Sequence, residues 1–382
     1  MLISLWDNQR LRSWVGQILL LALFVGTIWW LFDNTLTNLT ARSIRVGFDF
    51  LSRPANFPIS ESIVPYEPTD SFFRAYVAGV GNTILVSLVV IVLATLLGLA
   101  VGLGRRSRHP LVSGLAGTFV TLMRNVPLIV QLLFWYALIT SSLPAPRNAL
   151  HPLPGVFLSV RGLYLPGVEV GGHGWIFALG LAAALFAWWR WASLAERCLN
   201  LTPPRAFALL AATVAAFAVA LWFACGMSLE PSLPRLAGFN FAGGLRLSPE
   251  FTALMIGLVI YTSAFIGEII RGGIDAVAKG QWEAGRAVGL SDRQTLFHII
   301  VPQALRIIIP PLTTQYLSTV KNSTLAVAVG FPELGLVVGT VINQTGQAIE
   351  SVLVLLMVFL TISTSVSLFM NWYNARVALV SR

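Results

Sequence analysis

The sequence predicts an all-α protein that crosses a lipid bilayer several times. Hydrophobic residues make up 56% of its 382 residues and charged residues only 11%, whereas soluble domains carry about 25% charged residues. The mean hydropathy is +0.77. Apolar stretches of roughly 20 residues, the length that a spanning helix needs, recur along the chain. These three observations exclude a soluble enzyme, a disordered protein and a fibrous protein.

Eight stretches are predicted to span the membrane. The second contains no charged residue, and the third is broken by Pro127. The seventh is about 38 residues long and would extend nearly 57 Å as one straight helix, so we expect it to break at the turn 330–332. The predicted spans are 15–32, 76–103, 111–139, 174–191, 206–227, 251–270, 305–342 and 352–372.

Lysines and arginines indicate the orientation. With the N-terminus in the cytoplasm, 15 of the 25 basic residues lie on that side and 8 on the other. Cytoplasmic loops carry such an excess, so we expect both termini to lie on the cytoplasmic side of the membrane. The first stretch is expected to stay as an anchor, because Trp29, Trp30 and Phe32 occupy the place of the small residues at a signal-peptide cleavage site.

The spans and loops suggest five segments. The loop at 33–74 contains four prolines and is expected to be an ordered outer loop or lateral helix. The segments are an anchor helix with a periplasmic loop (1–75), a first part of the membrane core (76–140), inserted periplasmic loops with a two-helix hairpin (141–249), a second part of the core (250–372) and a cytoplasmic tail (373–382).

The long loop at 271–306, predicted to be cytoplasmic, has the pattern of two short helices. Gly280 is expected to cap the first, with Glu283 near its start. Gly289 is expected to end it as a C′ glycine, and Ser291 with Gln294 forms a capping box that opens the second. Such a compact, helical projection suits docking into a groove of a partner protein.

This loop resembles the coupling loop of ATP-binding-cassette (ABC) import permeases. That family's pattern is Glu-Ala-Ala, three residues, Gly, nine residues, Ile, one residue, Leu-Pro. The chain keeps the full spacing over the 20 residues from Glu283 to Pro302, with Gly285 and Val301 as its two departures. A Glu followed by Gly near a helix start is also a common capping pattern, but the spacing and the position between two spans favour the coupling loop.

Other motifs resemble the polar amino acid branch of this family, over residues 76–140 and 250–372, although Asn125 and Val126 depart from that branch's Arg-Gly-Thr-Pro. The N-terminal span, the loop after it and the inserted span pair resemble the longer general L-amino acid importers of Gram-negative bacteria. These motifs are Gly81-Asn82-Thr83, Arg105-Arg106-Ser107, Arg124-Asn125-Val126-Pro127-Leu128 with Gln131, 268–273, 279–284 and Lys321-Asn322-Ser323.

The resemblance implies a fold with a permease core of five helices and a cytoplasmic coupling helix. It implies a second permease subunit, in a heterodimer, two ATPase subunits and a periplasmic amino-acid-binding protein. ATP and Mg²⁺ would be bound by the ATPase, since the chain has no phosphate-binding loop of its own, and no cofactor is expected in this chain. The implied coupling residues are Gln281, Trp282, Glu283, Ala284, Gly285, Ala287, Gly289, Leu290 and Ser291, within 279–302.

Polar residues inside spans suggest a substrate pathway, because they are costly in a bilayer. Each also has a simpler interpretation: Asn82 and Thr83 as helix caps, Gln131 as a helix–helix hydrogen bond, Glu268 as a partner of Arg271, and Lys321 as a side chain reaching the interface. The pathway candidates are Asn82, Thr83, Gln131, Glu268, Lys321, Asn322 and Ser323.

The sequence therefore predicts a non-enzymatic permease subunit that imports L-amino acids. The same machine could carry opines, glutamine or a sulfur amino acid. An ion-coupled transporter would need carboxylates in mid-span, and Glu268 and Glu350 both lie near span ends. The four histidines and two cysteines show no metal-ligand spacing, and no basic stripe with aromatics suggests nucleic acid. The lipid bilayer is the remaining expected partner.

Overall fold

The computed structural model describes residues 9–41, 47–171, 174–198, 203–226 and 228–377. These residues form two compact parts. The first comprises Met1–Ile129 and Gly257–Arg382, and the second comprises Val130–Ile256.

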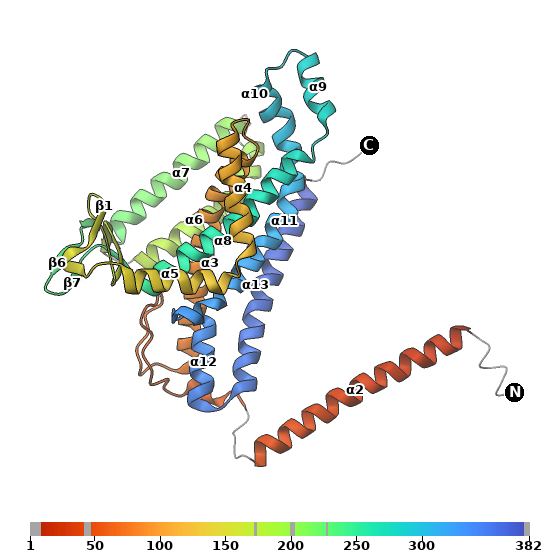
Figure 1. Cartoon of the computed structure of the whole chain (residues 1–382), viewed down its shortest axis with the longest axis vertical. Coiled ribbons are helices and arrows are strands. Elements are labelled where there is room, and N and C mark those ends of the chain that lie inside the picture. The colour runs from red at the N-terminus through yellow and green to blue at the C-terminus, as the bar shows by residue number, and fades with distance from the viewer. Residues whose placement is uncertain (1–8, 42–46, 172–173, 199–202, 227, 378–382) are drawn as a thin grey trace. The chain divides into compact units, whose positions relative to one another are not determined.

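Long helices dominate the first part (Figure 1). Five helical stretches of the described residues are long and apolar enough to cross a membrane, or six if α4 and α5, broken at 126–127, count as one span. The eight-span count stays a prediction. The helices outside the insertion, of which α5 and α8 continue into the second part, are α2 (Gln9–Ala41), α3 (Phe72–Arg105), α4 (Pro110–Asn125), α5 (Leu128–Ser142), α8 (Pro249–Asp275), α9 (Lys279–Ala287), α10 (Asp292–Thr295), α11 (Val301–Asn322), α12 (Leu334–Thr345) and α13 (Ala348–Val377).

The seventh predicted span breaks where the sequence indicates. Helix α11 tightens into a 3₁₀ turn over Ser323–Val329, which Gly330 ends in the left-handed conformation with φ of 80°. Helix α12 then begins at Leu334, and the Glu333 side chain caps it by accepting a hydrogen bond from the Leu336 N–H at 3.0 Å. Glycine adopts positive φ at no steric cost, so the Gly-Phe-Pro turn redirects the chain here.

The described residues of the second part include eight short strands, whereas only loops beside the helix pair were expected from the sequence. Its largest sheet is antiparallel with the order β1-β2-β3-β8, in which Tyr164 is opposite Arg246. The all-α prediction is therefore wrong for this insertion. The strands are β1 (Leu150–Leu153), β2 (Val156–Ser159), β3 (Gly162–Leu165), β4 (Gly167–Gly171), β5 (Ser228–Ser232), β6 (Arg235–Ala237), β7 (Asn240–Ala242) and β8 (Leu245–Leu247).

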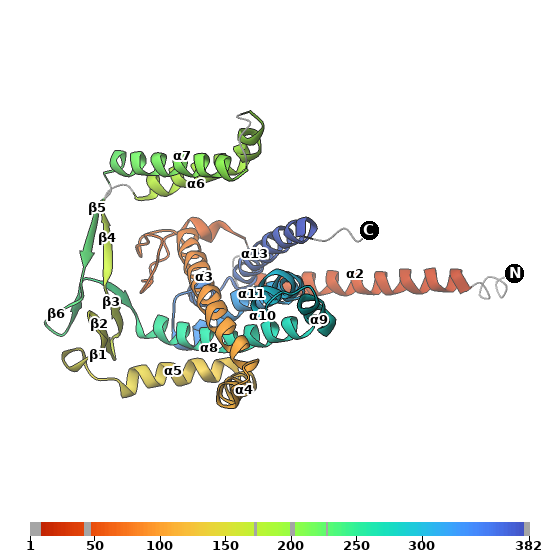
Figure 2. The same ribbon diagram turned by 90° about the horizontal axis from the view of Figure 1, so that it is seen from above.

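A hairpin of two helices joins β4 to β5 in the chain. Helices α6 (Gly174–Cys198) and α7 (Pro203–Ala224) lie side by side (Figure 2). Gly180 allows this approach, because a Cβ there would lie 2.5 Å from a methyl carbon of Leu221. A small core of Ala149, Tyr164 and Phe241 sits under the strands.

An aromatic core fixes the segment 47–71 on the first part. The rings of Phe50 and Phe57 each pack on Phe72, with centroids 5.9 and 6.4 Å from the Phe72 centroid. All three share a buried cluster with Leu334 and Val337 of α12. The segment is thus an ordered loop with one 3₁₀ turn, Asp49–Ser52. Of the loop predicted at 33–74, residues 33–41 instead continue α2, and 42–46 lie outside the described residues. The order of 47–71 agrees with the prediction, and its place outside the membrane stays a prediction.

Helices α3 and α8 approach closely through glycine. A Cβ on Gly98 would lie 2.6 Å from Cγ2 of Ile266, and a Cβ on Gly102 would lie 2.7 Å from the Gly267 carbonyl oxygen. Small residues at helix interfaces allow such backbone contact in membranes. The two glycines therefore have a packing role.

Replacing Gly98 by Ala should destabilise the protein, because the added methyl group overlaps Ile266. Overpacking of this kind costs about 1–3 kcal/mol. Thermal unfolding of the purified chain in detergent should show a lower midpoint for Gly98→Ala. Gly114→Ala is the matched control, since a Cβ added at Gly114 would meet no atom within 4 Å, and its midpoint should be unchanged or slightly raised. Equal midpoints for both variants would contradict the packing role.

Candidate functional site

Helices α9 and α10 form a projection at one end of the first part, opposite the end that holds α12 (Figure 1). We call residues 279–300 the knob. Helix α9 begins at Lys279 with Ala278 as its N-cap residue, and no side chain caps it. The expectation that Gly280 caps this helix is wrong, since Gly280 lies within the first turn.

The end of α9 is fixed by its own backbone. Gly289 has φ of 85°. The Gly289 N–H donates to the Arg286 carbonyl at 2.9 Å, and the Leu290 N–H donates to the Gly285 carbonyl at 3.0 Å. These two bonds make the Schellman arrangement, which confirms Gly289 as the C′ residue.

Side chains tie the rest of the knob together. Ser291 Oγ accepts from the Gln294 N–H, and Gln294 Oε1 accepts from the Ser291 N–H at 3.0 Å, so the predicted capping box is present. Gln303 Nε2 of α11 donates to Gln281 Oε1 of α9 at 2.9 Å. The capping box thus fixes the start of α10, and the glutamine pair ties the start of α9 to α11.

The two knob helices touch at Gly285 and Thr295. Thr295 is fully buried, and a Cβ on Gly285 would lie 2.6 Å from both its Cγ2 and its Oγ1. The second alanine of the family pattern would not fit against this threonine. The departure at Gly285 thus has a steric reason within the chain.

One face of α9 and the residue after it are exposed in the described part of the chain. Glu283, Ala284, Ala287 and Val288 are exposed, and Val288 is 79% exposed. A short, fixed helix with one carboxylate among small side chains can enter a groove, whereas it offers no acid–base pair for catalysis. Trp282 and Leu290, two more of the predicted coupling residues, are half-buried on its inner side.

Asn82 holds two segments at the other end of the first part. Its Nδ2 donates to the carbonyls of Glu61 at 2.7 Å and Pro332 at 2.8 Å, and its Oδ1 accepts from the Ile63 N–H at 3.3 Å. We call this arrangement, with Thr83 and Glu333, the outer clamp. Helix α3 begins at Phe72 with Ser71 as its cap, so the interpretation of Asn82 and Thr83 as caps is wrong.

Thr83 completes the outer clamp. Its hydroxyl donates to the Gly79 carbonyl at 3.0 Å and accepts from the Leu334 N–H at 3.1 Å, while Glu333 Oε2 lies 3.5 Å away. Glu333 is fully buried and was not predicted from the sequence. The available signal was its place directly before an apolar helix, where a carboxylate can accept a backbone N–H.

The remaining pathway candidates lie on α5, α8 and α11 with its 3₁₀ continuation. Gln131 is buried in α5 and belongs to the second part. Lys321 is exposed and Asn322 half-buried at the end of α11, and Ser323 is buried with its hydroxyl donating to the Val320 carbonyl at 2.7 Å. The structure brings Asn82 and Thr83 together, and the pathway itself stays a prediction.

Glu268 lies in a cluster of ion pairs. It pairs with Arg271, as the simpler interpretation predicted, and also with Arg105 of α3. Arg271 and Arg106 both contact Asp275, at 2.9 and 2.8 Å. Because Arg105 and Glu268 come from different helices, their ion pair joins α3 to α8 at a second place, in addition to the contact at Gly98 and Gly102.

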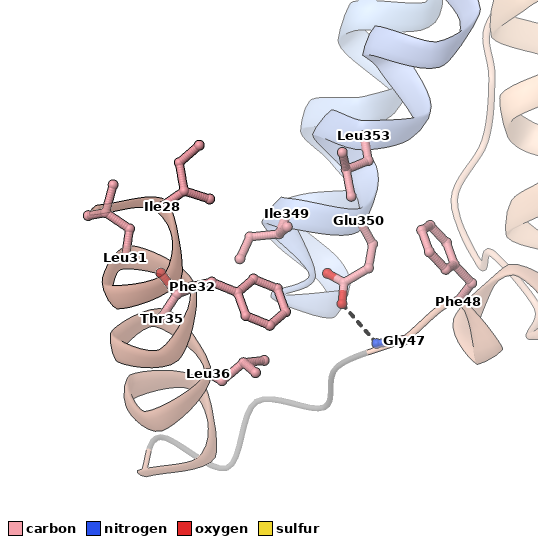
Figure 3. Close-up of a pocket in the computed structure, with 10 residues that line it drawn as sticks. All are labelled: Ile28, Leu31, Phe32, Thr35, Leu36, Gly47, Phe48, Ile349, Glu350 and Leu353. Atoms are coloured by element: carbon pink, nitrogen blue, oxygen red, sulfur yellow. Dashed lines mark hydrogen bonds between the residues drawn. The ribbon is translucent and has the colours of Figure 1, made fainter. Parts of the chain in front are cut away.

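Glu350 lines an apolar pocket of about 470 Å³ between α2 and the start of α13 (Figure 3). Its Oε1 accepts a hydrogen bond from the Gly47 N–H at 2.8 Å. Phe32 and Leu36 of α2 face Ile349 and Glu350 across this pocket. The carboxylate thus lies in the first turn of α13, near a span end as the sequence indicated.

Comparison with known proteins defines the class. Residues 200–379 match the model of the binding-protein-dependent transport system inner membrane component. A putative amino-acid ABC transporter permease protein, YhdX, of Escherichia coli K12 is 44% identical, over 98% of this chain and 96% of its own. The general L-amino acid transport system permease protein AapQ of Rhizobium johnstonii is 39% identical, over 98% of this chain and 94% of the length of AapQ.

A third relative is the glutamate/glutamine/aspartate/asparagine transport system permease protein BztB of Rhodobacter capsulatus. It is 33% identical over 98% of this chain and 96% of its own. The chain therefore belongs to the family of ABC transporter permeases, as a multi-pass inner membrane protein. The described residues hold no group of three or more His, Cys, Asp or Glu that could bind a metal ion.

Gly285→Ala should loosen the knob, because the added methyl group overlaps Thr295. We expect hydrogen exchange of the α9 amides to become on the order of tenfold faster, which corresponds to about 1.4 kcal/mol. Thr295→Ala should change little, since no hydrogen-bond partner of its hydroxyl is present among the described atoms. The double variant should regain most of the protection, and its failure to do so would contradict the contact.

Asn82→Ala should free the segment 47–71, because two carbonyl groups lose their donor. Each buried group left unpaired costs about 1–3 kcal/mol. Limited digestion with a glutamate-specific protease should cut after Glu61 faster than in the unchanged protein, because the Glu61 carbonyl loses the Asn82 donor. Asn38→Ala in α2 is the control, since the Asn38 amide makes only exposed bonds. Equal cutting of both variants would show that the outer clamp does not hold this segment.

Proposed function

We propose that the chain is the permease subunit of an ATP-driven, binding-protein-dependent importer of L-amino acids. The observation that carries the proposal is the knob, a rigid helical projection with an exposed carboxylate, in a chain aligned end to end with amino-acid permeases. The relatives' names support the substrate class. AapQ is named as a permease of a general L-amino acid transport system, which favours import of several amino acids over import of a single one.

The knob would couple this chain to an ATPase. Glu283, Ala284, Ala287 and Val288 would enter a groove on the ATPase, which binds ATP and Mg²⁺. Gln281, Trp282, Gly285, Gly289, Leu290 and Ser291 would keep the knob rigid, so that closure of an ATPase dimer moves it as one body. Movement would pass to α8 and α11, which enter and leave the knob, and would open the pathway alternately to either side.

The full assembly would contain a second permease subunit, two ATPase subunits and a periplasmic amino-acid-binding protein. We propose a heterodimer of permeases with both termini cytoplasmic. Helices α6 and α7, of 25 and 22 residues, reach the length needed for a crossing. With these two helices, and with α4 and α5 as one broken span, the chain would cross the membrane eight times.

The substrate pathway would run beside α11 and its break, at the interface with the second permease. Broken helices are where transporters commonly bind substrate. Lys321 and Asn322, which are not fully buried, are the best placed of the candidates to face it, while Asn82, Thr83 and Ser323 would shape the break from behind. Gln131 and Glu268 remain candidates for the same pathway.

Uptake into proteoliposomes tests the coupling. The complex co-purified with its ATPase would be reconstituted with ATP inside and the binding protein outside. We expect ATP-dependent uptake of several radiolabelled L-amino acids, reduced by at least about tenfold in Glu283→Ala with Gly289→Asp, because the knob loses its carboxylate and its turn.

Glu67→Ala is the control, since Glu67 is also an exposed glutamate and lies outside the knob, and uptake should be unchanged. Uptake driven by a proton or sodium gradient without ATP would overturn the proposed class. Uptake of a single opine, of glutamine or of a sulfur amino acid would keep the class and replace the substrate.

A further inference from the structure

A polar pocket of about 440 Å³ lies between α3, α4 and α8, at the end of the first part where the ion-pair cluster lies. Arg105, Arg124 and Glu268 line it together with Thr121, Asn125 and Phe265. Thr121, Arg124 and Asn125 are spaced as i, i+3 and i+4 on α4, so they share one helix face. Three polar side chains thus face the pocket from a single helix.

Positive charge exceeds negative charge around this pocket. Four guanidinium groups, of Arg105, Arg106, Arg124 and Arg271, accompany two carboxylates, of Glu268 and Asp275. Both carboxylates are already shared by two arginines each. No described carboxylate pairs with Arg124, although its positive charge acts on Arg105. The local excess is therefore two positive charges.

Arg124 is held in a position to bind an anion. Its guanidinium carbon lies 5.1 Å from the centroid of the Phe265 ring. Stacking on an aromatic face holds the guanidinium plane and leaves the N–H donors at its edge. Such a planar set of donors matches the oxygens of a phosphate or carboxylate. Thr121 and Asn125 add a hydroxyl and an amide beside it.

The surroundings favour a lipid as the source of the anion. Leu111, Leu115 and Leu122 of the same helix are 69%, 73% and 53% exposed, so an apolar surface adjoins the polar pocket. The pocket also lies beside the C-terminal end of α3 at Arg105, where the second predicted span is followed by a polar loop. Basic pockets between helices on the cytoplasmic side suit anionic lipid headgroups.

We propose that this pocket binds the phosphate of an anionic phospholipid headgroup from the inner leaflet, with Arg124 as its principal ligand. The proposal rests on the cytoplasmic orientation in the proposed function. Arg124 and Arg105 contact the phosphate oxygens, and the acyl chains lie along the leucines of α4. Arg105 and Arg271 neutralise the Glu268 carboxylate, so the excess positive charge around the pocket disfavours a cation.

Lipid retention by the purified full-length chain tests the proposal. Native mass spectrometry would compare palmitoyl-oleoyl phosphatidylglycerol with the phosphatidylcholine of the same chains. We expect phosphatidylglycerol to be retained with an affinity on the order of tenfold higher, because one charge-assisted hydrogen bond contributes a free energy equivalent to such a change in affinity. Arg124→Gln should abolish the preference, and Arg124→Lys should keep part of it, since the charge remains while the planar donor set is lost.

Arg108→Gln is the matched control, because Arg108 is an exposed arginine just beyond α3 and does not line the pocket, and its preference should equal that of the unchanged chain. An unchanged preference in Arg124→Gln would overturn the proposal. Full displacement of the lipid by inorganic phosphate would assign the site to a soluble phosphate, and displacement by L-glutamate would assign it to a substrate carboxylate. Retention needs neither ATP nor partners, so its failure would leave the transport proposal untouched.

Discussion

The hydrogen bonds of the Asn82 side chain are the interaction on which the α12 end of the first part depends. The bilayer supplies no water to backbone groups, so a chain that leaves helical geometry at depth must find partners within the protein. The turn before α12 is buried in the protein, and one amide satisfies both its Pro332 carbonyl and the Glu61 carbonyl of the loop before α3. The aromatic core, α3 and α12 are assembled around that point.

Local signals in the sequence predicted the helices and much of the knob. Long apolar runs specify helices in a bilayer, and Gly289, Ser291 and Gln294 act on backbone groups within a few residues of themselves. The break after α11 was predictable for the same reason, because Gly330 and Pro332 cannot continue a helix. The start of α9 was misplaced, since Ala278 caps it without a side-chain bond.

Contacts between distant residues were beyond such signals. Asn82 and Pro332 are 250 positions apart, and β3 pairs with β8 across the whole helix hairpin. Strands of three to five residues carry too little alternation to be recognised without their partners. The role of Glu333, and the meeting of Gly285 with Thr295, likewise depend on how the chain returns on itself.

The close approach of α3 and α8 has a consequence for where the permease can bend. Backbones that meet through Gly98, Gly102 and Gly267, and are joined again by Arg105 and Glu268, leave no room for sliding, because packed interiors resist continuous deformation. The two helices are therefore expected to move together as one rigid unit. A displacement that enters α8 through the three-residue link 276–278 would therefore carry α3 with it.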